Sequence, residues 1–207
     1  MRCLILLTWV ALWLGSPYKV RTQDTRANNQ SPSPAKLTLE DQFERTHDLT
    51  DYVGDIVVLL YGDRQGMPAN KELGEKLYIH YHPQAKGQSP AQAARVPVTP
   101  LPDLPEGKRS PDVKIVPVTC FSKAGNVFKS VIRNQVKKNA PETAVWLDFD
   151  DKTKEQFGLT PGVPNLAIID GQGRVRYRSA GELDAKGYSR LLEAIDLLRK
   201  ETVRANR

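Results

Sequence analysis

One segment, "DIVVLLY" at Asp55–Tyr61, constrains the fold more than any other. It is a continuous apolar run, rich in β-branched residues and without polar alternation. Such a run is typical of a strand buried on both faces, as occurs in parallel sheets covered by helices. The chain has 207 residues, enough for one domain with a core around such a strand. The sequence therefore predicts a covered α/β sheet with this strand inside it.

Helical and extended patterns alternate along the rest of the chain. Pro68 stands at an early helical position, and Leu73, Leu77 and Tyr81 recur every four residues as a buried stripe. Further strands are expected at 113–121 and 143–149 and on both sides of the Gly-rich turn Asp170–Gly173. Further helices are expected at 125–139 (stripe Val127, Val131, Ile132, Val136), at 151–160 as a short turn, and near the end (Tyr188, Leu191, Leu192, Ile195, Leu198). An extended pair ending in a turn at Gly54 precedes them. This order predicts a sheet with parallel and antiparallel parts.

Residues 83–112 interrupt the pattern with seven prolines in thirty residues. We expect an extended insertion without helix or strand, longer than a simple connection. It leaves the first helix and returns at the start of the next strand, so its ends lie at the rim opposite Gly66. Two interpretations stay open: a segment that binds a partner through preordered polyproline stretches, or a spacer loop.

The N-terminal residues 1–16 have one early cation, Arg2, before an apolar run from Cys3 to Gly15. This length suits a secretory signal peptide and falls short of the roughly 20 residues of a membrane span. An uncleaved N-terminal anchor is the alternative. Residues 17–36 are polar with Ser-Pro repeats and read as a disordered spacer, so the domain is expected at 37–203. The sequence thus predicts an exported protein, periplasmic or extracellular, that touches a membrane only through its N-terminus.

The net charge of +6 raises the question of nucleic-acid binding. Charges of both signs are mixed, and no RNA-binding signature accompanies them, so we expect a solvated surface and no nucleic-acid partner. His80 and His82 stand two apart at a helix end and point in different directions, so neither a metal nor a cofactor is expected. The turn Asp170–Gly173 lacks the strand-to-helix context of a phosphate loop.

Two segments match one family pattern. "LEDQFERTHDLTDYVGDIVVLLYG" and "GVPNLAIIDGQGRVRYRSAG" resemble the opening and the late hairpin of secreted thioredoxin-like and alkyl-hydroperoxide-reductase-type redoxins. The resemblance runs from about Leu37 to Leu198 and is broken by the Pro-rich insertion. It implies a thioredoxin-like fold, with a central mixed sheet flanked by helices. It also implies that the Val163–Pro164 bond is cis and faces the active-site turn.

The resemblance places the family's C-x-x-C motif on Gly66, Met67, Pro68 and Ala69. Both cysteine positions, Gly66 and Ala69, therefore lack a thiol. Thiol–disulfide exchange needs a thiolate attacker and a resolving partner, so this turn is a degenerate active site. The backbone at Val163 and Pro164 can still form a groove for an extended peptide, or the loop can have this geometry only in order to fold.

Cys120 is the only cysteine left once a signal peptide is removed, so it has no internal disulfide partner. In a thioredoxin-like sheet it follows the strand beside Asp55–Tyr61 and lies near the degenerate turn. It is either a small packing residue or a reactive thiol assisted by Lys123. Our first hypothesis is accordingly a non-catalytic peptide- or protein-binding module. The alternatives are a one-cysteine oxidoreductase or peroxidase using Cys120, and a structural domain tethered by its N-terminus. The sequence leaves the oligomeric state open.

Overall fold

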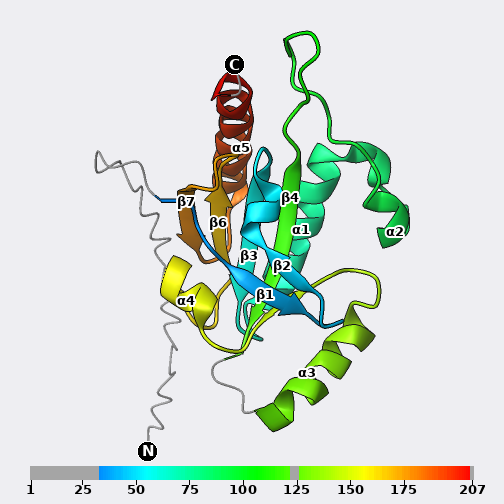
Figure 1. The fold of residues 1–207 in the computed structure, drawn as a ribbon, viewed down its shortest axis with the longest axis vertical. Helices are drawn as coiled ribbons and strands as arrows, with labels where there is room; N and C mark the ends of the chain where they lie inside the picture. The colour runs from blue at the N-terminus through cyan, green and yellow to red at the C-terminus, as the bar shows by residue number, and fades with distance from the viewer. Residues whose placement is uncertain (1–32, 122–125, 206–207) are drawn as a thin grey trace, which may run out of the picture.

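The computed structural model describes residues 33–121 and 126–205. It contains a seven-stranded mixed sheet in the order β2-β1-β5-β4-β3-β6-β7 (Figure 1). Strand β3 (Ile56–Gly62) pairs in parallel with β4 (Val113–Cys120) and antiparallel with β6 (Asn165–Ile169). The predicted central strand and the mixed character of the sheet are confirmed.

All seven residues of β3 are buried, and they alternate between two cores. Val57, Leu59 and Tyr61 face a core that includes Trp146 and Phe157. Ile56, Val58 and Leu60 face the core built with helices α1 (Met67–Tyr81) and α5 (Ala185–Ala205). Leu77 and Tyr81 of the predicted α1 stripe are buried in this second core, with Leu73 packed against it.

Shorter strands complete the sheet, of which β5 is parallel to β4. Strands β1 (Thr38–Asp41) and β2 (Thr46–Asp48) pair with each other at one edge, and a 3₁₀ turn (Leu49–Tyr52) follows. Strand β1 also pairs with β5 (Trp146–Asp148), while β7 (Val175–Ala180) forms the other edge beside β6. Helix α4 (Lys152–Phe157) is the short helical turn that the sequence predicts.

The ordered chain begins earlier than the boundary we predicted at Leu37. Ala35 is already buried, and its N–H donates to the Gly173 carbonyl at 2.8 Å. The end of the predicted spacer is therefore held by the β6–β7 turn. The predicted signal or anchor at 1–16 lies outside the described residues.

Helix α3 (Asn126–Asn139) contradicts the predicted apolar stripe in part. Val131 is 63% exposed rather than buried. The cause is a basic inner face: the Arg133 guanidinium lies 5.5 Å from the centre of the Phe149 ring and pairs with Glu40. The Arg133 side chain is only 15% exposed, so its guanidinium covers the aromatic ring where the stripe predicts aliphatic contact.

We expected the insertion to contain no helix, and this prediction is wrong. The insertion contains a 3₁₀ turn (Pro83–Ala85) and one helical turn, α2 (Pro90–Ala93). Ser89 and Gln92 form a capping box around α2, a signal that the sequence "SPAQ" carries. None of the helices in 33–121 and 126–205 is both long and apolar enough to cross a membrane.

Candidate functional site

The turn that the sequence predicts to be a degenerate active site joins β3 to α1, and Asp63 ties it to a neighbouring loop. One Asp63 carboxylate oxygen accepts the N–H groups of Gln65 at 3.0 Å and Gly66 at 3.1 Å. The other accepts the Gly162 N–H at 2.7 Å. Burial alone would raise the pKa of Asp63, but the three N–H groups outweigh it and lower the pKa below its ordinary value. An ionised Asp63 thus fixes the turn against the loop before β6.

Gly66, where the resemblance places the first cysteine of the motif, is in direct contact with this loop. A Cβ built on Gly66 would lie 2.3 Å from the Val163 carbonyl oxygen and 2.6 Å from its carbon. Its backbone has ordinary helical angles, φ −77° and ψ −20°, so the close approach is what requires glycine. Val163 therefore faces the turn as predicted. A cysteine at position 66 would not fit unless that loop moved.

The prediction of a cis bond between Val163 and Pro164 is wrong, because every peptide bond among the described residues is trans. The loop is shaped instead by Asn165, whose amide nitrogen donates to the Val163 carbonyl at 2.9 Å and to Thr160 O at 3.0 Å. Its amide oxygen accepts the Thr160 N–H at 2.9 Å. These bonds form with the trans isomer, which X–Pro bonds favour by about 0.5–1 kcal/mol.

The remaining residues of the motif form the outer surface of this region. Met67 is half-buried, Pro68 is exposed, and Ala69 is half-buried. Asn70, the next residue, is 2% exposed and donates to the Tyr61 carbonyl at 2.9 Å. Neither Asn70 nor Asp63 was predicted as a site residue. Asp63 does begin "DRQG", a pattern typical of a turn capped by a side chain.

Cys120 ends β4 at the same rim, but its thiol is shielded. The residue is 6% exposed, and burial raises its pKa to about 12, with a further contribution from Asp148. The nucleophilic form of cysteine is the thiolate, which a group of this pKa hardly populates at neutral pH. Lys123, the proposed helper, lies outside the described residues. The geometry favours the packing interpretation over the reactive one.

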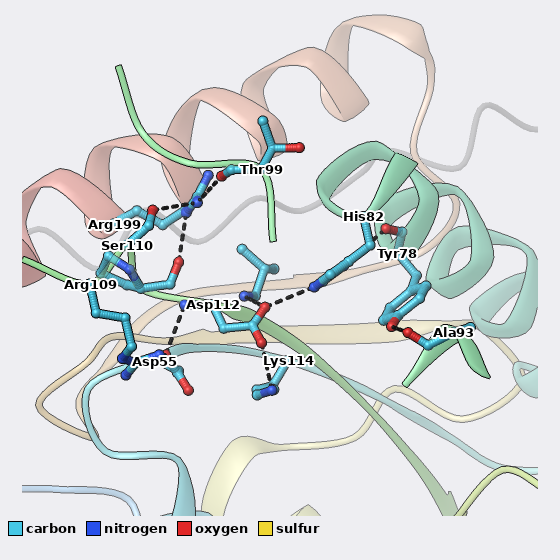
Figure 2. Close-up of polar contacts among 12 residues, drawn as sticks. Asp55, Tyr78, His82, Ala93, Thr99, Arg109, Ser110, Asp112, Lys114 and Arg199 are labelled. Atoms are coloured by element: carbon cyan, nitrogen blue, oxygen red, sulfur yellow. Dashed lines mark hydrogen bonds and ion pairs between the residues drawn. The ribbon is translucent and has the colours of Figure 1, made fainter. Parts of the chain in front are cut away.

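A second polar cluster lies at the opposite rim, where α1 ends and β4 begins (Figure 2). Its centre is Asp112, which accepts hydrogen bonds from His82 Nε2 at 2.9 Å and Lys114 Nζ at 2.6 Å. The Asp112 N–H donates to Asp55, which also accepts from Arg109 at 2.7 Å. Burial would raise the pKa of Asp112, but the bonds from His82 and Lys114 outweigh it and lower that pKa.

Arg199 reaches this cluster from α5 and fastens the insertion. The side chain is nearly fully buried, and its Nη2 donates to the Thr99 carbonyl at 2.6 Å and Ser110 Oγ at 3.0 Å. Its Nε donates to the Pro111 carbonyl at 3.0 Å. One guanidinium thus holds both ends of the segment between Thr99 and Pro111.

The two histidines considered as metal ligands, His80 and His82, lie in different environments. His80 is exposed, whereas His82 is buried and bonded to Asp112. Within the described part of the chain, no group of three or more His, Cys, Asp or Glu residues could hold a metal ion.

Comparison with known proteins identifies the architecture. No protein-family model and no curated protein sequence matches this chain. Among solved structures, the exposed lipoprotein thioredoxin of Streptococcus pneumoniae matches with a TM-score of 0.51 and 17% identity, over 77% of this chain and 99% of that one. A DsbF homologue from Corynebacterium diphtheriae matches with a TM-score of 0.49 and 16% identity, over 87% and 96% of the two chains. The fold is thioredoxin-like, as the sequence predicts, and likeness at this identity establishes the fold alone.

Proposed function

We propose that this thioredoxin-like chain is an exported, non-catalytic module that binds a peptide or protein at the rim formed by 64–68 and 161–164, here called the turn rim. The observation that carries the proposal is the contact of Gly66 with the Val163 carbonyl. It supports the proposal because a thiol-bearing side chain at position 66 would collide with that carbonyl. The inaccessibility of Cys120 supports the same conclusion.

The surface of the turn rim suits recognition. Met67, Val163 and Pro164 are half-buried, and Pro161 and Pro68 are exposed, so an apolar centre reaches solvent there. The three hydrogen bonds to Asp63 hold its two loops together. A surface that is already ordered loses little conformational entropy on binding, which favours affinity. Export rests on the predicted signal in residues 1–16.

Titration of the folded protein with a disulfide reagent across pH, beside Cys120→Ser, tests the absence of thiol chemistry. We expect no fast reaction between pH 6 and 9, and release of the Cys120 thiol only in denaturant, because its pKa is raised to about 12. Rapid reaction with an apparent pKa below the ordinary value of about 8.5 would instead support the one-cysteine oxidoreductase.

Selection from a random peptide display library on the immobilised chain tests the binding role. We expect selected peptides to bind Met67→Glu at least about tenfold more weakly, because a charge then lies in the apolar centre. Leu197→Glu is the matched control, since it places the same charge at an apolar residue of α5 that is 54% exposed. Equal affinity of every selected peptide for the two variants would contradict binding at the turn rim.

A further inference from the structure

A cleft of about 260 Å³ separates the insertion from the last turns of α5. One wall is formed by residues 101–105, and the other by Lys200, Val203 and Arg204. In Figure 1 the insertion and the C-terminal end of α5 rise at the same end of the molecule, opposite α3. The cleft is therefore separate from the turn rim. Leu101 and Val203, 7% and 8% exposed, give it an apolar floor.

The cleft is built by the buried core rather than by a loose loop. Arg199 holds the Thr99 carbonyl and the Ser110 hydroxyl, and Ser110 Oγ also accepts the Leu101 N–H at 3.1 Å. Figure 2 shows Arg199 reaching Thr99 and Ser110 from α5. Because the same helix forms the facing wall, these bonds fix the width of the cleft.

The edges of the cleft have an excess of positive charge. Lys200 and Arg204 are exposed and one helical turn apart, and neither forms an ion pair or hydrogen bond with any residue the structure describes. Asp103 is the only acid among the lining residues. Unpaired cations beside an apolar floor are complementary to an anionic group adjoining an apolar one.

We propose that this cleft binds a short acidic peptide segment, in which an apolar side chain contacts Leu101 and Val203 and a neighbouring Asp or Glu carboxylate lies between Lys200 and Arg204. The volume favours this occupant, because it is below the roughly 300–1,000 Å³ of small-molecule sites and fits single side chains of a longer chain. The proposal does not depend on the function of the turn rim.

Fluorescence anisotropy of the full chain with a labelled peptide pool tests this site. The pool is Gly-X-Glu-X-Gly with X as Leu, Val or Phe, and the matched pool replaces Glu by Gln. We expect the Glu pool to bind at least about fivefold more tightly, with an advantage that shrinks as salt screens the charges. Failure of the Glu pool to bind at millimolar protein, or equal binding of the two pools, would overturn the proposal.

Charge reversal on α5 locates the binding. Lys200→Glu with Arg204→Glu should weaken binding of the Glu pool at least tenfold. Lys186→Glu with Arg190→Glu is the control, because it reverses two exposed cations at the same spacing near the other end of the helix. We expect the control to change affinity less than twofold. Equal losses in both double variants would mean nonspecific attraction to a basic helix and would refute the site.

Discussion

The two rims of the sheet are closed in different ways. At the turn rim, Gly66 packs against the Val163 carbonyl. The half-buried carboxylate of Asp63 accepts the Gly162 N–H there. At the opposite rim, the half-buried carboxylate of Asp112 accepts the Val113 N–H at the start of β4. The buried guanidinium of Arg199 donates to the Pro111 carbonyl of the insertion. A buried charge leaves unpaired polar partners behind when it is removed, whereas a steric contact can relax. The difference between the two rims predicts that stability depends more on the rim opposite the turn rim.

Arg199→Met should have the largest effect on stability. It leaves the Thr99 and Pro111 carbonyls without their buried donor, and we expect a loss of about 3 kcal/mol in the free energy of unfolding. Urea denaturation measures it, and limited proteolysis should cut the insertion earlier in the variant. Arg190→Met, at an exposed position of the same helix, should cost less than about 0.5 kcal/mol. A loss below about 1 kcal/mol for Arg199→Met would mean that the insertion is held by other contacts.

Asp112→Asn should rank second, with a loss of about 2 kcal/mol at pH 7, because the carboxylate accepts charge-assisted bonds from His82 and Lys114. The pKa of Asp112 is lowered in the folded state, so its stabilisation is present above the unfolded pKa of about 3.9 and is lost as pH falls below that value. The difference between wild type and variant should therefore shrink as pH falls below about 4. A difference that grows below pH 4 would contradict this assignment.

Much of the fold could be predicted because the spacing of apolar residues along the chain indicates which side chains are buried. The run at Ile56–Gly62 and the stripe of α1 identify elements whose apolar side chains meet in two cores. Helix α3 was predicted less well, since Arg133 covers Phe149 where periodicity expects an aliphatic residue. Periodicity counts an arginine as polar, although its stem can pack against an aromatic ring.

The candidate sites were harder to predict, because they depend on contacts between residues distant in sequence. The resemblance implied a cis Val163–Pro164 bond facing the active-site turn, but the bond is trans, and the Val163 carbonyl lies against Gly66. The anchoring of the insertion joins Arg199 to Thr99, residues one hundred positions apart. Nothing in the local sequence of either residue indicates the other.

Gly66→Ala tests the packing at the turn rim, because the variant can change the free energy of unfolding in either direction. At ordinary helical angles, replacing glycine by alanine stabilises a protein by about 0.4–1 kcal/mol, because the unfolded chain loses freedom. The Val163 carbonyl would lie 2.3 Å from the new Cβ, so we expect a net destabilisation of about 1–2 kcal/mol instead. Urea denaturation measures it against Gly74→Ala inside α1, the helix that Gly66 precedes, where the nearest atom is a flexible Leu60 methyl at 3.1 Å.

The two glycine variants should differ by at least about 1 kcal/mol, with Gly66→Ala the less stable. Stabilisation by Gly66→Ala would show that the Val163 loop moves aside at little cost. A thiol at position 66 would then be sterically allowed, and the absence of cysteine there would need a chemical explanation rather than a structural one. Destabilisation of the expected size would mean that the turn rim is closed by its packing, and that placing cysteines at positions 66 and 69 would not by itself create a dithiol site.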